Sequence, residues 1–453
     1  MNSIDRTTAR EQPSETPLVA RVLGPFQRFF STSAAGGVVL LVTTAIALAW
    51  ANSPWAETYH HLWETPFTIG APGASLTLSL HAWVNDGLMA IFFFLVGLEI
   101  KREIVAGELS NPRQAALSVA AAIGGMVVPA LLFLAVTAGT DRVGGWGVPM
   151  ATDIAFAIGV LAIAGRRAPL AVKVFLTALA IVDDLAAVLV IAFFYTASVK
   201  LVPLAVAGVA LVVLIGMNRA GVMRPAAYVL VGVVLWVAML KSGVHATIAG
   251  VLTALTIPAV QRLDAPAFAE RAQEIVREFA ARMKPEQTAP NAEQAYAIAR
   301  LRQAAEDAES PLARLEHMLH TPVALLIMPI FALANAGVAF TGSPAATLSD
   351  PAALGVMAGL IVGKPVGVLL MAWLAIKTGL AVKPDGVTWG HLVGVALLAG
   401  IGFTMSIFIA TLAFDAPAVL DSAKAGIFAA SLVMGIAGAV VISRATRTGP
   451  PTP

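Results

Sequence analysis

Two adjacent carboxylates lie in the middle of a stretch of sequence that is otherwise apolar. Asp183 and Asp184 occupy the centre of "ALAIVDDLAAVLV", residues 178–190. A charge at the middle of a membrane costs roughly 2.5–3.5 kcal/mol on insertion scales, so such residues face a polar cavity or one another. Neighbouring helix positions point about 100° apart, and both carboxylates can therefore border one cavity without both facing lipid.

The chemistry that suits such a pair is competition between a proton and a hard cation. Interacting carboxyl groups titrate as a coupled pair rather than one by one, and dehydrated alkali cations prefer oxygen ligands, as Ca²⁺ and Mg²⁺ do. A proton and an alkali cation would compete for the same oxygens. If the site faced the two sides of a membrane in turn, this competition would exchange the cation for protons.

Few other ionisable side chains fall inside apolar stretches. Asp153 and Lys364 lie close to the centres of theirs, at a depth similar to that of the aspartate pair, and this indicates one shared site. Lys364 is also suited to neutralising an aspartate as a structural ion pair. A single aspartate could be purely structural, but that reading explains an adjacent pair less well. The other such residues are Asp86, Glu99 and His245.

The composition places these residues on membrane-spanning helices. Of 453 residues, 58% are hydrophobic and only 12% are charged, which is too little charge to cover the surface of a soluble protein. Cysteine is absent, so disulfides and thiolate chemistry are excluded. A spanning helix needs about 20 apolar residues. We expect an all-α polytopic membrane protein with twelve spans, near 34–51, 82–100, 114–138, 147–165, 171–195, 201–217, 223–240, 243–260, 320–340, 352–376, 388–412 and 420–443.

The positions of Lys and Arg orient these spans. With a cytoplasmic N-terminus, the outside segments hold only Arg142, Lys200 and Lys241, far fewer than the inside segments. Cytoplasmic loops are enriched in these residues, so both termini are expected in the cytoplasm. The expected regions are a tail at 1–33, a membrane domain at 34–444 and a second tail at 445–453.

Two of the spans carry signals of interruption. The fourth reads "GVPMATDIAFAIG", with Pro149 in its first half, and the eleventh reads "LLAGIGFTMSIFIA", with Gly400 and Gly402 midway. Interrupted spans in corresponding positions of two halves indicate broken helices at the interface of an inverted repeat. Half-helix N-termini are partly positive and C-termini partly negative, which suits Asp153 and Lys364 respectively.

Three segments are expected outside the membrane. Residues 65–80 alternate polar and apolar on either side of a Pro-Gly turn, which predicts a small external hairpin. Residues 266–284 have the apolar spacing of an amphipathic helix, and residues 292–319 read similarly until Pro311 interrupts them. Both belong to a long cytoplasmic loop at 261–317, for which a surface helix or a partner contact is expected.

Eight stretches resemble the NhaA family of Na⁺/H⁺ antiporters, and together they cover the chain from about 30 to 445. The resemblance implies twelve helices, of which 3–5 and 10–12 (114–195 and 352–443) form an inverted repeat whose fourth and eleventh members cross unwound. The other helices (34–100 and 201–340) would form a panel on the dimer side. The stretches are "FFFLVGLEIKRE" (92–103), "ATDIAFAIGVLA" (151–162), "ALAIVDDLAAV" (178–188), "LKSGVHATIAGV" (240–251), "LEHMLH" (315–320), "FALANAGV" (331–338), "GKPVG" (363–367) and "GIGFTMSIFIA" (400–410).

The resemblance also implies an activity. Na⁺ or Li⁺ would leave the cell as protons enter, electrogenically and by alternating access, so that the protein regulates intracellular pH and sodium from the cell inner membrane. Such a protein is a secondary transporter and not an enzyme, and it needs no cofactor beyond the transported ions. Its expected partners are the lipid bilayer and a second copy that binds through the external hairpin, and no nucleic acid.

Single residues can be matched to the resemblance. Asp183 and Asp184 match the pair that binds the cation and the proton, and Lys364 matches the lysine that pairs with Asp183 and is able to carry a proton. Thr152 and Asp153 match the contributors from the unwound fourth helix to the Na⁺ site. The positions linked to pH response near a cytoplasmic funnel are Glu99, Glu103, His245, Glu316, His317 and His320, and Asp86 matches an acid on the outward side.

One departure from the family pattern concerns the long loop. Residues 261–314 replace what is usually a short linker, directly before Glu316 and His317. The transfer of a pH-sensing role to those two residues is therefore less direct than the transfer of the ion site.

Other classes of membrane protein fit the sequence less well. An intramembrane aspartyl protease would carry a Gly-x-Gly-Asp motif, which does not occur in the chain. A transporter of organic anions would need surplus positive charge, whereas here three acids accompany one lysine. A passive channel stays open as an alternative and would show flux without proton coupling.

Overall fold

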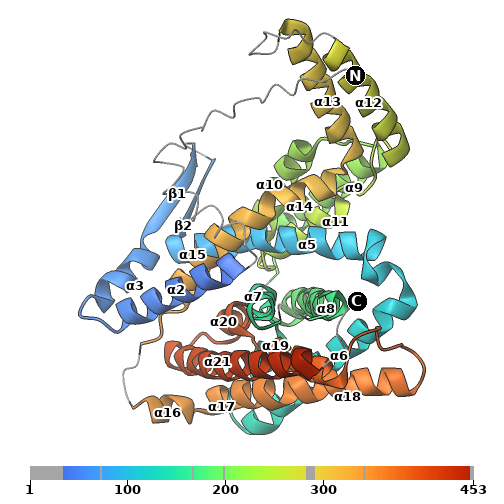
Figure 1. Ribbon diagram of the computed structural model, residues 1–453. Helices are drawn as coiled ribbons and strands as arrows, with labels where there is room; N and C mark the ends of the chain where they lie inside the picture. Colours follow the sequence, from blue (N-terminus) through green and yellow to red (C-terminus); the bar gives the residue numbers. More distant parts are fainter. Residues whose placement is uncertain are drawn as a thin grey trace, which may run out of the picture.

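The protein is almost entirely helical, with a single two-stranded sheet among the residues described (Figure 1). A computed structural model describes residues 34–71, 74–165, 168–196, 199–281, 291–339 and 343–448. The expected N-terminal tail at 1–33, the Pro72-Gly73 turn and the last residues, 449–453, lie outside this part of the chain.

The elements follow one another in the order of the expected spans. The first half contains α2 (Ala34–Ala51), α3 (Ala56–Glu64), β1 (Pro66–Ala71), β2 (Ala74–Ser79), α4 (Leu80–Ala82), η1 (Trp83–Leu88), α5 (Met89–Ala106), η2 (Glu108–Ser110), α6 (Pro112–Thr137), η3 (Val143–Met150), α7 (Ile154–Ala164), α8 (Leu170–Phe194), α9 (Leu201–Arg219) and α10 (Pro225–Ser242). The second half contains α11 (Ile248–Thr256), α12 (Ala265–Ala281), α13 (Ala292–Ala308), α14 (Pro311–Pro322), η4 (Val323–Ile327), α15 (Met328–Asn335), α16 (Pro344–Leu348), α17 (Pro351–Met357), η5 (Ala358–Gly363), α18 (Lys364–Lys377), α19 (Trp389–Ala399), α20 (Phe403–Ala413) and α21 (Pro417–Thr448).

The expected polytopic helical fold is confirmed, although the helices differ in length from the expected spans. Among the described residues, eight helices are long and apolar enough to cross a membrane, or up to ten if each bent pair is one span. The expected span at 243–260 contains only the nine-residue helix α11. Gly243, in the left-handed region at φ 84°, ends α10 before it, and Pro258 disfavours a helical conformation at Ile257.

Two other boundaries also differ. The ninth span begins at Pro311, because α14 continues through η4 into α15. The last helix, α21, runs on to Thr448 and so extends past residue 445, where the tail is expected to begin.

The β-hairpin stands off from the helices (Figure 1). Its strands pair antiparallel from Pro66 opposite Ser79 to Ala71 opposite Ala74. The Trp83 indole nitrogen donates to the Phe67 carbonyl at 2.9 Å, which ties the hairpin to the start of η1. The side chains of Phe67 and Ile69 are about half exposed, at 51% and 52%, so the hairpin presents an apolar surface.

The remaining helices form two packed groups with a layer between them. In Figure 1, α5, α9, α10, α11 and α14 lie above, α6, α17, α18, α19 and α21 lie below, and α7, α8 and α20 lie between the two groups. The upper group has its own buried core, which includes Leu98, Leu214, Tyr228 and Leu235. The middle and lower groups share the larger core, to which α5 of the upper group also contributes. The central layer is therefore covered by protein from both sides.

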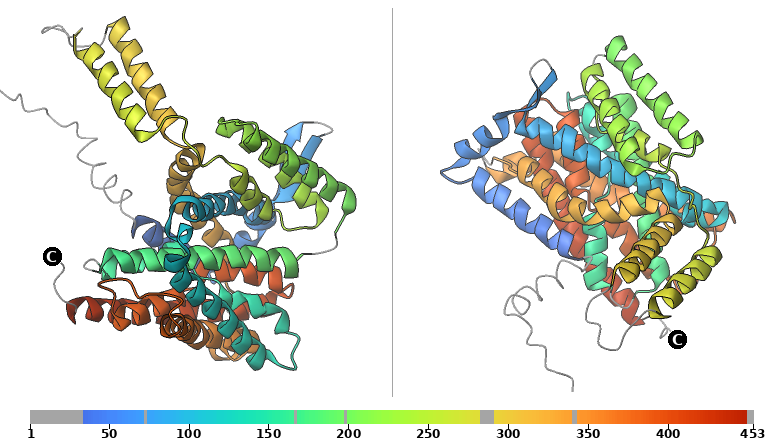
Figure 2. Two further views of the ribbon diagram at one scale, coloured as in Figure 1. Left: turned by 90° about the vertical axis from the view of Figure 1, so that its right-hand side faces the viewer. Right: turned by 90° about the horizontal axis from the view of Figure 1, so that it is seen from above.

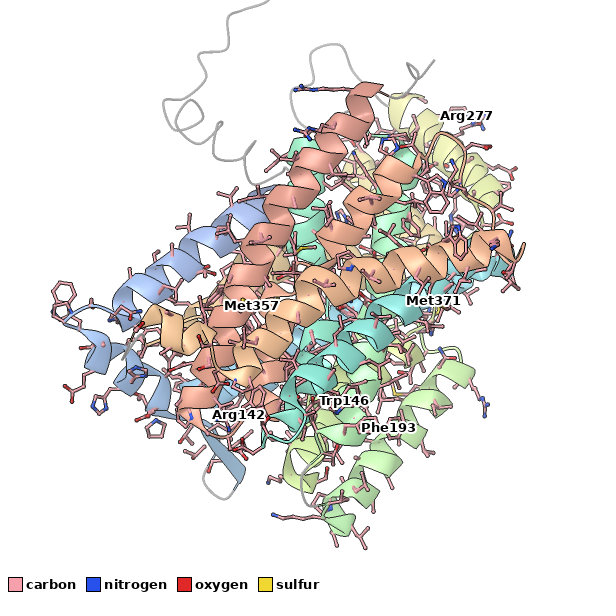
Figure 3. The ribbon with its side chains drawn as sticks, turned by 90° about the horizontal axis from the view of Figure 1, so that it is seen from below. Arg142, Trp146, Phe193, Arg277, Met357 and Met371 are labelled. Carbon is pink, nitrogen blue, oxygen red and sulfur yellow. The ribbon has the colours of Figure 1, made fainter. Side chains whose placement is uncertain are left out.

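A close crossing of α6 and α18 brings Lys364 to the central layer. In Figure 3, Met357 and Met371 mark α17 and α18, which run beside α6. A Cβ at Gly367 would collide with the backbone carbonyl of Gly124, and a Cβ at Gly125 would lie 3.5 Å from Cε of Lys364. Glycines at these positions let the two helices meet at backbone distance, as small residues do in membrane helix packing.

The long loop forms a helical hairpin of its own. α12 and α13 project from the rest of the protein (Figure 2) and enclose a small core of Ile275, Ala297 and Ala304. At the base of the hairpin, the backbone N–H groups of Arg262 and Leu263 both donate to the Asp307 carbonyl at 3.0 Å. Pro311, which interrupts the second amphipathic stretch, begins α14.

The α6–α18 crossing gives a prediction for stability. Gly367→Val should destabilise the protein by at least about 1–3 kcal/mol, because overpacking forces the helices apart. Thermal unfolding of the purified protein in detergent would measure the effect. Gly208→Val on α9 is the matched control, since a Cβ there meets nothing within 4 Å; equal unfolding temperatures for the two variants would contradict the prediction.

Candidate functional site

The aspartate pair lies on α8, in the central layer of the molecule (Figure 1). The Asp183 and Asp184 residues are 1% and 2% exposed. The run that surrounds them is apolar enough to cross a membrane as one helix of 25 residues. Neither carboxylate is open to solvent in this conformation.

Lys364 forms an ion pair with Asp183. Its Nζ lies 2.5 Å from Oδ2 of Asp183, and both side chains are fully buried. The same ammonium donates to the carbonyl of Met150, the last residue of η3. A helix C-terminus carries partial negative charge. The Lys364 ammonium therefore lies between two negative groups, the Asp183 carboxylate and the C-terminus of η3.

Asp153 lies at the N-termini of two helices at once. As the N-cap of α7, its Oδ1 accepts from the Phe156 N–H at 3.0 Å. Its Oδ2 accepts from the Thr404 N–H at 3.1 Å and also from the Thr404 hydroxyl, in the first turn of α20. The two carboxylate oxygens of Asp153 thus accept three hydrogen bonds. The main role of its negative charge is to offset the partial positive charge of two helix N-termini.

The two broken helices meet at their breaks. Residues 151–153 separate η3 from α7, and residues 400–402 separate α19 from α20. The Asp153 N–H donates to the Ile401 carbonyl at 2.7 Å, so backbone groups exposed by one break are satisfied by the other. Irregular backbone inside a membrane protein requires such internal partners.

Thr152 connects the aspartate pair to this crossing. Its hydroxyl oxygen lies 2.7 Å from Oδ2 of Asp183 and 2.8 Å from the carbonyl oxygen of Ala399. Thr152 and Ala399 are both fully buried. The threonine therefore contacts a charged side chain of α8 and the last residue of α19 with a single oxygen atom.

Asp184 makes no hydrogen bond to any residue in the part of the chain that the structure describes. Its Oδ1 and that of Asp183 are both buried without a donor among those residues. Its carboxylate interacts electrostatically with Asp183, Glu99, Asp153 and Lys364. Buried polar atoms are nearly always satisfied, so two unsatisfied oxygens on adjacent residues suit a hard cation that takes oxygen ligands.

A second group of charges lies where α5 meets α14. Arg102 pairs with Glu103 at 2.9 Å and with Glu316 at 3.4 Å. Glu99 interacts electrostatically with all three of these residues. Glu316 interacts in turn with His317 and His320. The structure thus brings together five of the six residues that were matched to pH response.

Two expected site residues lie elsewhere. His245 does not join this acidic group, and its ring packs edge-on against Phe408 of α20 with centroids 6.0 Å apart. Asp86 lies in the π-helical turn η1, where its backbone carbonyl accepts from the Trp236 indole at 2.8 Å.

Sequence reasoning missed several partners. Thr404 lies in the expected interruption of the eleventh span, but the sequence assigned it no role. Arg102 lies in the stretch "FFFLVGLEIKRE" and was also assigned no role. The carbonyls of Met150 and Ala399 carry no signal in sequence, since any residue supplies one. Each of these two carbonyls takes part in the site only because a break in its helix leaves it without a helical hydrogen-bond partner.

Comparisons with known proteins show the family to which the chain belongs. A family model described as Na⁺/H⁺ antiporter 1 matches residues 27–442. The Na⁺/H⁺ antiporter NhaA of Oleidesulfovibrio alaskensis is 52% identical over 421 residues, covering 93% of this chain and 94% of that protein. The protein of the same name from Koribacter versatilis is 49% identical over 433 residues, covering 95% of this chain and 94% of that protein.

The buried ion pair gives a prediction about stability. Asp183→Asn should destabilise the protein by about 3–5 kcal/mol, because it leaves the Lys364 ammonium buried without its counter-charge. Adding Lys364→Met should recover part of this loss, since the double variant buries no net charge at that position. Thermal unfolding of the single and double variants would measure both effects. If the double variant loses as much stability as the two single variants lose together, the two residues are not coupled and the prediction is contradicted.

Proposed function

Because the chain belongs to the Na⁺/H⁺ antiporter 1 family, we propose that it exports Na⁺ in exchange for protons at the Asp183–Asp184 pair. The observation that carries this proposal is the pair of buried Oδ1 atoms without a donor among the described residues. Na⁺ and Li⁺ are both hard cations and both suit these oxygens. The Thr152 hydroxyl is near enough to Asp183 to join them as a ligand.

Competition for Asp183 supplies the coupling. The Lys364 ammonium donates to Oδ2 of Asp183 at 2.5 Å. A cation that binds to the Asp183 carboxylate weakens the ion pair with Lys364. Lys364 can then release its proton, because a buried ammonium without a counter-charge is costly. Asp184 releases a second proton as it becomes a ligand. More than one proton then moves for each Na⁺, which makes the exchange electrogenic.

Alternating access is supported by the burial of the site and by the two breaks beside it. Asp183 and Asp184 are at most 2% exposed, so the ions need a movement that opens one side at a time. The segments 151–153 and 400–402 are held by hydrogen bonds rather than by continuous helix. In this mechanism Asp153 balances the partial positive charge of the half-helix N-termini during the movement.

The distribution of charge and apolar surface supports the expected membrane, the expected orientation of the chain in it and the expected partner. The asymmetry of Lys and Arg supports an inner-membrane protein with both termini in the cytoplasm. The exposed Phe67 and Ile69 of the hairpin support a homodimer in which this hairpin contacts a second copy. A panel of α2, α5, α9–α11, α14 and α15 would then face the partner, with the remaining membrane helices forming the core.

The exchange gives a direct prediction. Asp183→Asn and Asp184→Asn should each abolish Na⁺-driven proton flux in proteoliposomes, because an amide has no negative charge to trade between H⁺ and Na⁺. Asp350→Asn is the matched control, since Asp350 caps α17 away from the aspartate pair. Calorimetry should show protons released as Na⁺ binds; Na⁺-driven flux that persists in both variants would rule the proposal out.

The second group of charges gives a prediction about pH dependence. Glu316 interacts with Glu99, and Glu99 interacts with Asp184. Glu316→Gln removes one negative charge, so the remaining carboxylates lose their protons more readily. The acid limb of the pH–activity curve should then move to lower pH, by up to about one unit.

The exposed Glu270 on α12 provides the control, and Glu270→Gln should leave the curve in place. The replacement of His317 and His320 tests the histidines of the same group. If neither change moves the curve, competition at the aspartates alone determines the pH dependence, and the group has no sensing role.

A further inference from the structure

His391 closes the N-terminus of α19 through its side chain. The helix begins after Thr388, whose backbone N–H donates to Nδ1 of His391 at 3.1 Å. The His391 N–H donates in return to the Thr388 hydroxyl at 3.2 Å. This reciprocal pair is a capping box, in which the third helical position ordinarily carries glutamate or glutamine. Here a histidine supplies the side-chain acceptor instead.

This capping bond fixes the protonation state of the ring. A backbone N–H can only donate, so Nδ1 must accept, and the single ring proton of a neutral histidine then lies on Nε2. The residue is 2% exposed, and Nε2 has no hydrogen-bond partner among the described residues. Only a neutral ring can form the cap, because both nitrogens of a charged imidazolium are donors.

The charged groups around the start of α19 are mostly cations. Within the described part of the chain, Lys383 is the one charged group that acts on the ring electrostatically. Its ammonium donates to the Val387 carbonyl, directly before the cap, and Asp385 lies in the same loop. Of the helices packed against α19, α7 carries no titratable residue. The charged residues at the same end of α8, α18 and α21 are Lys173, Lys377, Arg444 and Arg447.

Protonation of His391 would release the start of α19. The imidazolium would donate from Nδ1, and the acceptor beside it is the Thr388 hydroxyl, 3.2 Å away. The Thr388 N–H would then lose its acceptor, and the loss of an N-cap interaction destabilises a helix. The first turn of α19 also packs closely on α21, where a Cβ at Gly390 would lie 3.2 Å from Cβ of Ala445. A frayed first turn would therefore weaken this contact.

The other end of α19 belongs to the crossing of the broken helices. The Ala399 carbonyl lies 2.8 Å from the Thr152 hydroxyl, and the Ile401 carbonyl accepts from the Asp153 N–H. We infer that His391 is a positioning residue that caps α19 while its ring is neutral and slows the exchange when its ring is protonated. The inference rests on the proposed exchange, because a loosened α19 holds the crossing less firmly as the site changes sides.

The switch would respond to the cytoplasmic pH. In the proposed orientation the N-terminus of α19 lies at the cytoplasmic side, and a histidine ordinarily changes its charge between about pH 5 and 8. Each cycle of the proposed exchange brings protons into the cytoplasm. Protonation of His391 would therefore slow the protein once imported protons have acidified that side.

Transport in everted membrane vesicles, whose outer surface is the cytoplasmic face, tests the inference. Saturating Na⁺ removes the competition at the aspartates, and we expect the wild-type rate still to fall from about pH 8 to about pH 6. His391→Gln keeps an acceptor that cannot be charged and should retain about fivefold more of its rate at the acid pH, the factor that corresponds to one helix cap. His391→Leu has no acceptor and should be slow at both pH values. His61→Gln replaces an exposed histidine of α3 and should behave as the wild type.

Backbone hydrogen exchange provides a readout that does not depend on transport. After correction for the intrinsic rates, the wild-type Thr388 amide should lose about fivefold of its protection at the acid pH. His391→Gln should keep this protection, and His391→Leu should lack it at both pH values. An acid loss of rate or of protection that persists undiminished in His391→Gln would overturn the inference, as would a wild-type Thr388 amide that does not respond to pH. Failure of the proposed function would look different, since the wild-type protein would show no Na⁺-driven proton flux while the Thr388 amide still responded.

Discussion

The central region depends on the ion pair between Lys364 and Asp183, which is fully buried and 2.5 Å long. Two charges removed from water are tolerated only when each finds a partner of opposite sign and further hydrogen bonds. Lys364 has a second acceptor in the Met150 carbonyl, and Asp183 has a second donor in Thr152. The requirement to keep these partners in place accounts for much of the surrounding architecture, including the glycine-lined crossing of α6 and α18.

The broken helices supply the partners that an unbroken helix could not. A break inside a membrane protein exposes carbonyls on one side and N–H groups on the other. Here the Met150 carbonyl, which lacks a helical partner, accepts from Lys364. The amides at the starts of α7 and α20, which also lack helical partners, donate to Asp153. Each charged side chain thus meets the end of a helix whose partial charge is opposite to its own. The same groups that stabilise the crossing also set the electrostatic environment of the aspartate pair.

The charged residues of this site could be identified from sequence because they are rare within apolar stretches. Depth indicated that Asp183 and Lys364 share one site, the resemblance matched them as a pair, and the structure contains this ion pair. Pro149 and Gly400 marked the two breaks. Contacts across the fold were out of reach, since Thr404 and Asp153 are 251 residues apart and no local pattern links them. The helix expected at 243–260 was too long because hydropathy ignores the left-handed turn at Gly243. His245 was grouped with the acidic residues by resemblance, whereas packing places it against Phe408.

The helical hairpin of α12 and α13 has a consequence for how this protein could diverge. Its ends are closed by two hydrogen bonds to the Asp307 carbonyl, and its core is its own. The chain therefore leaves and rejoins the membrane region at nearly the same point, whatever lies between. Insertions at such closed, exposed positions are well tolerated. A lineage could lengthen, trim or exchange this appendage, and so acquire new regulation, while the path of the ions is inherited without change.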